Sequence, residues 1–101
     1  FCFGAYIFAD KQKELIGFTN FLYHPSTWSQ EDYCYLEDLF VTSNVRSNGA
    51  GRLLIEEVVK HCKQRSVSRL YWKTQEHNHV GRILYDKVAK NSGFLEYERE
   101  I

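Results

Sequence analysis

The sequence has 101 residues, of which 44% are hydrophobic and 16% aromatic, so it predicts one folded domain with a modest core. Lysine and arginine total 13, as do aspartate and glutamate, which excludes the basic excess of a nucleic-acid-binding module. No apolar run approaches the roughly 20 residues of a membrane-spanning helix. The three cysteines form no C-x-x-C motif, which argues against a disulfide framework or zinc site and favours a reducing, cytoplasmic environment.

The first half of the sequence predicts three β-strands. Residues 1–9 are apolar and aromatic, and strand character resumes over residues 15–23 after a charged connection. These two segments predict an antiparallel hairpin. Residues 24–32 contain the single proline among polar neighbours and predict a loop, whereas residues 33–42 predict the third strand.

The second half predicts alternating helices and strands. Apolar residues recur at helical spacing over residues 50–64 and again over residues 78–89. Residues 67–74 alternate in the manner of a strand, and residues 94–101 predict a last strand after a short turn. This order predicts a single α/β domain over residues 1–101, built on a mixed sheet.

A glycine-containing turn joins the third predicted strand to the first predicted helix. Its residues are Arg46, Ser47, Asn48, Gly49, Ala50, Gly51 and Arg52. The first N–H groups of a helix lack partners within the helix and carry the positive end of its dipole, so this position suits an anion. The glycines let a ligand approach the backbone, and the arginines suit phosphate oxygens. The turn therefore predicts a pyrophosphate site.

The turn fits the pattern R-x-x-G-x-G, which resembles the acetyl-CoA loop of the GNAT N-acetyltransferases. The preceding strand, Tyr-Leu-Glu-Asp-Leu-Phe-Val, is similar to that of the spermidine/spermine and thialysine acetyltransferases of this family. Asn78, followed by Leu-Tyr-Asp-Lys-Val over residues 84–88, resembles the fourth helix of the family. Trp28 lies in a Ser-Thr-Trp loop like those of the same amine acetyltransferases and of the fungal Hpa-type acetyltransferases.

The resemblance implies the GNAT fold, a mixed central sheet flanked by helices, with the family's N-terminal strand and helices missing before residue 1. It also implies acetyl-CoA as cosubstrate and no metal. Strands 33–42 and 67–74 would splay apart and hold the pantetheine arm between them. The residues implied to contact the cofactor, besides the turn, are Leu39, Phe40, Val41, Asn78, Tyr85 and Lys87. For Asn78 a helix cap, and for Lys87 a solvated surface position, are the alternatives.

Two residues are candidates for acid and base chemistry. An alkylamine must lose its proton before it attacks a thioester, and only about one molecule in 2,500 is neutral at pH 7. By resemblance, Glu37 serves as the base, directly or through a water, or anchors the cationic amine. It lies beside Asp38 in an apolar strand, where alternation would aim at most one of the two at a given pocket. For both acids, the alternative is a structural bond to a neighbouring strand or to a nearby arginine. Tyr85 is the candidate acid for the leaving thiolate, with packing on the sheet as its alternative role.

The resemblance implies direct transfer of an acetyl group to a primary amine of a small molecule, a polyamine or an amino-acid-like compound, with Trp28 and Glu37 at the substrate. One alternative is a protein acetyltransferase that acts on lysine or on a chain N-terminus. The other is a CoA-binding regulatory domain without turnover. We expect no nucleic-acid or membrane partner, and we expect a homodimer formed through the edge of strand 94–101. His77 and His79 lack a third ligand and predict no metal site.

Overall fold

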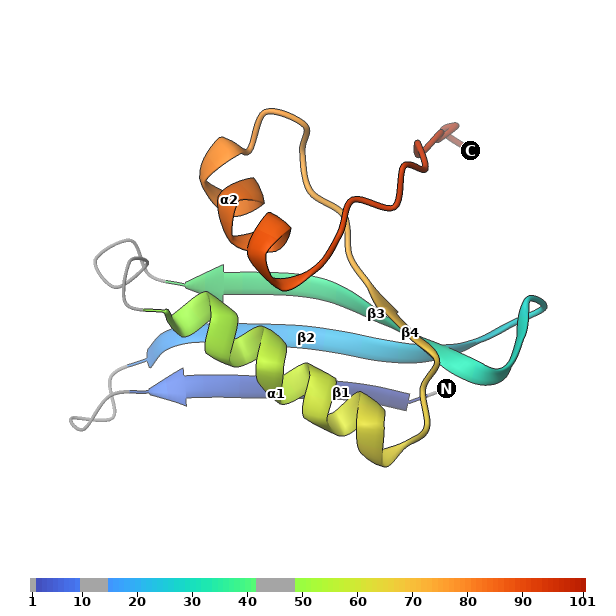
Figure 1. The fold of residues 1–101 in the computed structure, drawn as a ribbon, viewed down its shortest axis with the longest axis horizontal. Helices are drawn as coiled ribbons and strands as arrows, with labels where there is room; N and C mark the ends of the chain where they lie inside the picture. The colour runs from blue at the N-terminus through green and yellow to red at the C-terminus, as the bar shows by residue number, and fades with distance from the viewer. Residues whose placement is uncertain (1, 10–14, 42–48) are drawn as a thin grey trace.

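The computed structural model describes residues 2–9, 15–41 and 49–101 of the chain (Figure 1). In these residues four strands form one sheet in the order β1-β2-β3-β4, accompanied by two helices. The elements are β1 Cys2–Ala9, β2 Leu15–Ser26, β3 Ser29–Val41, α1 Ala50–Gln64, β4 Arg69–Tyr71 and α2 His79–Val88. The first three strands are antiparallel, and β4 runs parallel to β3. The predicted α/β class with a mixed sheet is confirmed.

The hairpin of β2 and β3 is longer than the sequence predicted. Residues 24–32 were expected to form a loop, but β2 continues to Ser26, β3 begins at Ser29, and only a tight turn separates them. The reason is the position of Pro25 in the ladder. The register shifts between His24 and Ser26, so the proline lies at an irregularity where its missing N–H group costs no ladder bond.

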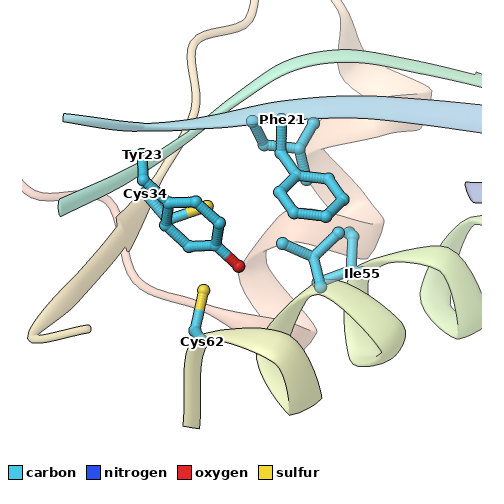
Figure 2. Packing of buried hydrophobic residues seen from close by; sticks show 7 residues of the cluster. Phe21, Tyr23, Cys34, Ile55 and Cys62 are labelled. Carbon is cyan, nitrogen blue, oxygen red and sulfur yellow. The ribbon is translucent and has the colours of Figure 1, made fainter. Parts of the chain in front are cut away.

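The hydrophobic core lies between the sheet and α1. Buried side chains of β2 and β3 point toward the helix, which crosses the face of the sheet (Figures 1 and 2). The buried residues of the core are Phe21, Tyr23, Cys34, Leu36, Ile55, Val58 and Cys62. The bounds of α1 match the predicted range of residues 50–64, because its apolar residues recur at a spacing that lines one helical face. We call this face of the sheet the inner face, and the opposite one the outer face.

The second helix, α2, packs beside the start of α1. Its partly buried residues Leu84, Tyr85 and Val88 contact the core, and its bounds lie within one residue of the predicted range. A Cβ atom added at Gly51 of α1 would lie 3.1 Å from Leu84 Cδ2. The absence of a side chain at Gly51 therefore lets the two helices approach closely.

The prediction of a last strand over residues 94–101 is wrong. This segment has no strand pairing, and its side chains are exposed. The alternation of glutamates was a strand signal, but β4 is only three residues long and offers little edge for a further strand. The predicted dimer edge is therefore absent from the described strands, and a homodimer stays a prediction. The two helices of the described chain are both too short or too polar to cross a membrane.

Candidate functional site

A cleft opens where β3 and β4 diverge. Their parallel pairing covers only three residues of each strand and ends at the pair Tyr35 and Tyr71. Beyond that pair β3 continues to Val41 beside β2 alone, while residues 72–75 leave the sheet. The cleft has a volume of about 570 Å³. Its lining residues are Leu36, Glu37, Asp38, Leu39, Trp72, Lys73, Thr74, Gln75, Asn78 and Tyr85. The strands thus separate as the resemblance implies.

A β-bulge in β3 lies on the wall of this cleft. The register pairs Asn20 with Asp38 and the next residue, Phe21, with Leu36, so Glu37 has no partner on β2. The bulge shifts the alternation of the strand, because Leu36 is buried whereas Glu37 and Asp38 are both exposed. Strict alternation predicted that one acid at most would face a given pocket. That prediction is wrong, since both line the cleft.

The two carboxylates differ in their partners. Asn20 Nδ2 donates a hydrogen bond to Asp38 Oδ2 at 3.1 Å, and Thr19 Oγ1 donates to the Asp38 carbonyl at 2.7 Å. Among the described residues, none makes a hydrogen bond or ion pair with the Glu37 side chain. Asp38 therefore holds β2 and β3 together, while Glu37 is available to a ligand in the cleft.

Tyr85 of α2 lines the cleft together with Trp72. Its ring meets the Trp72 ring edge-on, with 5.6 Å between centroids. Burial raises the pKa of Tyr85 above its ordinary value, because the phenolate would lose solvation. The phenol is therefore protonated at neutral pH and can donate a proton or hydrogen bond into the cleft.

Asn78 occupies the N-cap position of α2, so the cap that the sequence left open as an alternative is confirmed. Its side-chain oxygen accepts a hydrogen bond from the Gly81 N–H at 3.2 Å. Its Nδ2 donates to Thr74 Oγ1 at 2.9 Å. An amide nitrogen carries two protons, so a second donor remains for a ligand in the cleft that Asn78 lines. The predicted contact with the pantetheine amide stays a prediction.

The N-terminus of α1 has the features of an anion site. Gly49 precedes the helix with φ 80°, a left-handed conformation that favours glycine, and no atom of the described residues lies within 4 Å of the position of a Cβ there. The first intrahelical bond described runs from the Leu53 N–H to the Gly49 carbonyl at 3.0 Å. No described side chain caps this end, and its first turn holds no acidic residue.

The predicted contacts of the turn divide between described and undescribed residues. Arg46, Ser47 and Asn48 lie outside the described residues. Arg52 is exposed on the first turn of α1, whereas Ala50 and Gly51 are buried. Gly51 thus has a packing role against α2, in addition to any contact of its backbone with a ligand.

The strand residues predicted to pair with the cofactor lie along the far end of β3. Leu39 lines the cleft, and Phe40 stacks on Phe18 with 5.6 Å between ring centroids. Val41 ends the strand next to Gly51, whose added Cβ would lie 3.9 Å from Val41 Cγ2. The backbone edge of residues 36–40 that faces away from β2 has no strand beside it in the described chain.

Two predicted site residues lie apart from the cleft. Trp28 is 90% exposed at the turn between β2 and β3, at the end of the hairpin distant from α2 (Figure 1). Lys87 is exposed on α2 and does not line the cleft. His77 and His79 belong to no group of potential metal ligands within the described ranges. The roles of Trp28 at the substrate and Lys87 at the cofactor stay predictions.

Sequence reasoning missed the cleft residues that follow β4. Trp72, Lys73 and Gln75 form one wall, although the sequence assigned the first two only to a strand. No local sequence signal marks them, because the end of the parallel pairing is a property of the folded chain. The pairing ends at Tyr35 and Tyr71, and Glu37 and Lys73, each two residues further along, line the cleft that opens there.

Comparisons with known proteins agree with this geometry. Residues 2–89 match the Acetyltransferase (GNAT) family. The chain is 36% identical over 96 residues to the D-amino-acid N-acetyltransferase HPA3 of Saccharomyces cerevisiae, covering 95% of the chain and 60% of the relative. It is 30% identical over 93 residues to the thialysine N-epsilon-acetyltransferase of Caenorhabditis elegans, covering 87% and 58%. The chain thus spans about three fifths of these curated relatives.

Solved structures share the fold. The ribosomal-protein-alanine N-acetyltransferase from Brucella melitensis biovar Abortus superposes with a TM-score of 0.84 at 22% identity, covering 98% of this chain and 71% of that one. An integron cassette protein of V. cholerae superposes with a TM-score of 0.80 at 23% identity, covering 88% and 56%. The matched family, the two curated relatives and the diverging strands agree, and the chain belongs to the GNAT acetyltransferase family.

Proposed function

We propose that the chain is the core of an N-acetyltransferase that transfers an acetyl group from acetyl-CoA directly to a primary amine of a small molecule. The observation that carries this proposal is the cleft between β3 and β4, which is lined by both Glu37 of β3 and Tyr85 of α2. The names of the two curated relatives, which refer to D-amino acids and to thialysine, support an amine of this size.

The cosubstrate fits the shape and polarity of the site. The unpaired edge of β3 offers backbone groups to the pantetheine arm, in the manner of an added strand. The N-terminus of α1 offers N–H groups and the positive end of the helix dipole to the diphosphate. Gly49 keeps side-chain atoms away from that position. Ala50, Gly51 and Arg52 therefore bind the diphosphate through their backbone, and Leu39 and Asn78 contact the arm.

The two candidate groups act at opposite ends of the transfer. Glu37 binds the ammonium form of the acceptor and takes up its proton, directly or through a water, so that the neutral amine can attack the thioester carbonyl. The amine nitrogen forms a bond to the acetyl carbon, and the carbon–sulfur bond breaks. Tyr85, held protonated by burial, donates its proton to the departing thiolate. The products are the N-acetylated amine and CoA.

Calorimetric titration with acetyl-CoA, followed by an amine panel with a thiol-release readout, tests the proposal. We expect saturable binding and thiol release that depends on both substrates. Small amines and short peptides compared side by side distinguish this activity from protein acetylation. Binding without turnover on any acceptor would contradict the proposal and favour a CoA-binding regulatory domain.

A further inference from the structure

Lys73 lies at the mouth of the cleft on the outer face of the sheet. The last rung of parallel pairing joins Tyr35 to Tyr71, and Glu37 and Lys73 each follow that rung by two residues. Residues two apart on a strand share a face, and Tyr35 lies between two buried residues, so it faces outward. Lys73 Nζ lies 5.6 Å from the centroid of the Tyr35 ring, which fixes the ammonium group on that face.

The charged side chains of the cleft form an asymmetric set. Glu37 and Asp38 lie on the β3 wall, and Lys73 lies on the wall that follows β4. The other polar residues of the lining are neutral side chains. If the ammonium group of an acceptor lies at Glu37 and Asp38, the group next to it on the acceptor therefore faces the ammonium group of Lys73. A second ammonium group there is repelled, whereas a carboxylate is attracted.

Lys73 already binds a carboxylate of the chain itself. Its Nζ lies 2.6 Å from Glu96 Oε1 on the exposed C-terminal segment, and this partner holds the pKa of Lys73 above its ordinary value. The two side chains are 53% and 55% exposed. Because exposed ion pairs are weak and exchange readily with solvent, a ligand carboxylate can replace Glu96. The pair marks a position where this ammonium group accepts a carboxylate with good geometry.

We propose that Lys73 binds the carboxylate of the acceptor and thereby selects amino acids over polyamines. This inference rests on the proposed function and narrows its substrate class to amines that carry a carboxylate one or a few bonds from the reacting nitrogen. The ammonium group of the acceptor lies toward Glu37, and its carboxylate lies at Lys73 in place of Glu96. Lys73 contacts the acceptor without taking part in bond making.

The test compares amino acids with their primary amides, which keep the amine and remove the negative charge. Acceptors are D-alanine and L-lysine, each with its amide, and spermidine. Lys73→Gln is expected to lower kcat/KM for the amino acids about five- to tenfold, chiefly through KM. It should leave the amides within about twofold of the unmodified chain. Comparison of the acid-to-amide ratio of the variant with that of the unmodified chain cancels the intrinsic difference in amine reactivity.

Glu96→Gln is the matched control, because it breaks the same ion pair and keeps the Lys73 charge. We expect it to preserve or increase the preference for the amino acid over the amide. If both variants lower kcat/KM for acids and amides alike, the Lys73–Glu96 ion pair only tethers the C-terminal segment, and the proposal is overturned. A preference for spermidine over both amino acids in the unmodified chain overturns it as well.

A binding measurement separates this inference from the proposed function. Calorimetric titration of each amino acid and each amide into the CoA-bound chain gives their dissociation constants, so the preference for acid over amide is measured without turnover. A chain that releases no thiol but binds the acids more tightly than the amides, with the difference lost in Lys73→Gln, retains the inference and contradicts the transferase activity. A chain that binds acids and amides equally contradicts the inference, whatever its turnover.

Discussion

Tyr85 packs edge-on against Trp72 across the inner end of the cleft, with 5.6 Å between ring centroids. Trp72 is the first residue after β4, and Tyr85 belongs to α2, so the contact joins the diverging strand to the helix that covers it. The indole limits solvent around the phenol and contributes to the burial that raises the pKa of Tyr85. The contact thus holds the ring of the candidate acid in place, and burial favours its protonated form.

Removal of the Tyr85 hydroxyl tests the acid directly. Tyr85→Phe keeps the ring and its packing, and we expect it to lower kcat about 100-fold because the thiolate then leaves without a proton donor. Its affinity for acetyl-CoA should stay near that of the unmodified chain. Tyr97→Phe, at a tyrosine 89% exposed, is the control and should leave kcat unchanged. Equal kcat for the two variants would remove Tyr85 from the chemistry.

The pH profile follows from the direction of the Tyr85 shift. A raised pKa means that the phenol keeps its proton beyond the ordinary value of about 10. We therefore expect kcat to rise with pH as the bound amine loses its proton, and to show no descending limb below about pH 10. Steady-state rates from pH 6 to 10.5 measure this profile. A descending limb near pH 8 that disappears in Tyr85→Phe would show that the pKa is lowered instead.

The bulge in β3 predicts different effects for its two acids. Glu37→Gln removes the carboxylate with no described protein partner, and we expect kcat/KM for the amine to fall about 100-fold with little change in unfolding. Asp38→Asn alters the side chain that accepts from Asn20, so its main effect should be a small loss of stability. Kinetics and urea unfolding of both variants compare the two. The reverse assignment would hold if Asp38→Asn lost activity and Glu37→Gln kept it.

The contact of Gly51 with Leu84 predicts a packing effect. Gly51→Val places new atoms against Leu84 Cδ2, which lies 3.1 Å from even a bare Cβ, and we expect a loss of about 1–3 kcal/mol in the free energy of unfolding. Adding Leu84→Ala should recover part of that loss by making room. Urea unfolding of the single and double variants gives the coupling energy. Strictly additive effects would mean that the helices do not meet at this point.

The parts of the fold that sequence reasoning predicted best depend on local pattern. Helix α1 was predicted to the residue, because its apolar residues keep one spacing over four turns. The hairpin was predicted too short, because a proline such as Pro25 is typical of a loop. Only the structure shows the irregularity in register that lets β2 include it. Residues 94–101 have the alternation of a strand but lack a partner edge, and pairing between distant segments is not written in local sequence.

The candidate site was predicted only in part, because some of its features depend on how the strands pair. Glu37, Leu39, Asn78 and Tyr85 were named from family motifs, and all four line the cleft. Lys73 was missed because the end of the parallel pairing at Tyr35 and Tyr71, where the cleft opens, is set only by the folded chain. The bulge that exposes Asp38 beside Glu37 is likewise a property of strand pairing, because it arises from the offset of β2 against β3.

Hydrogen–deuterium exchange of the chain with and without CoA tests the central claim most directly, namely that the gap between β3 and β4 holds the cofactor. We predict that CoA protects backbone amides of residues 36–40 and of Ala50–Arg52, and leaves the hairpin turn around Trp28 unchanged. Binding of CoA that protects neither segment, or that protects the hairpin turn in their place, would contradict the account.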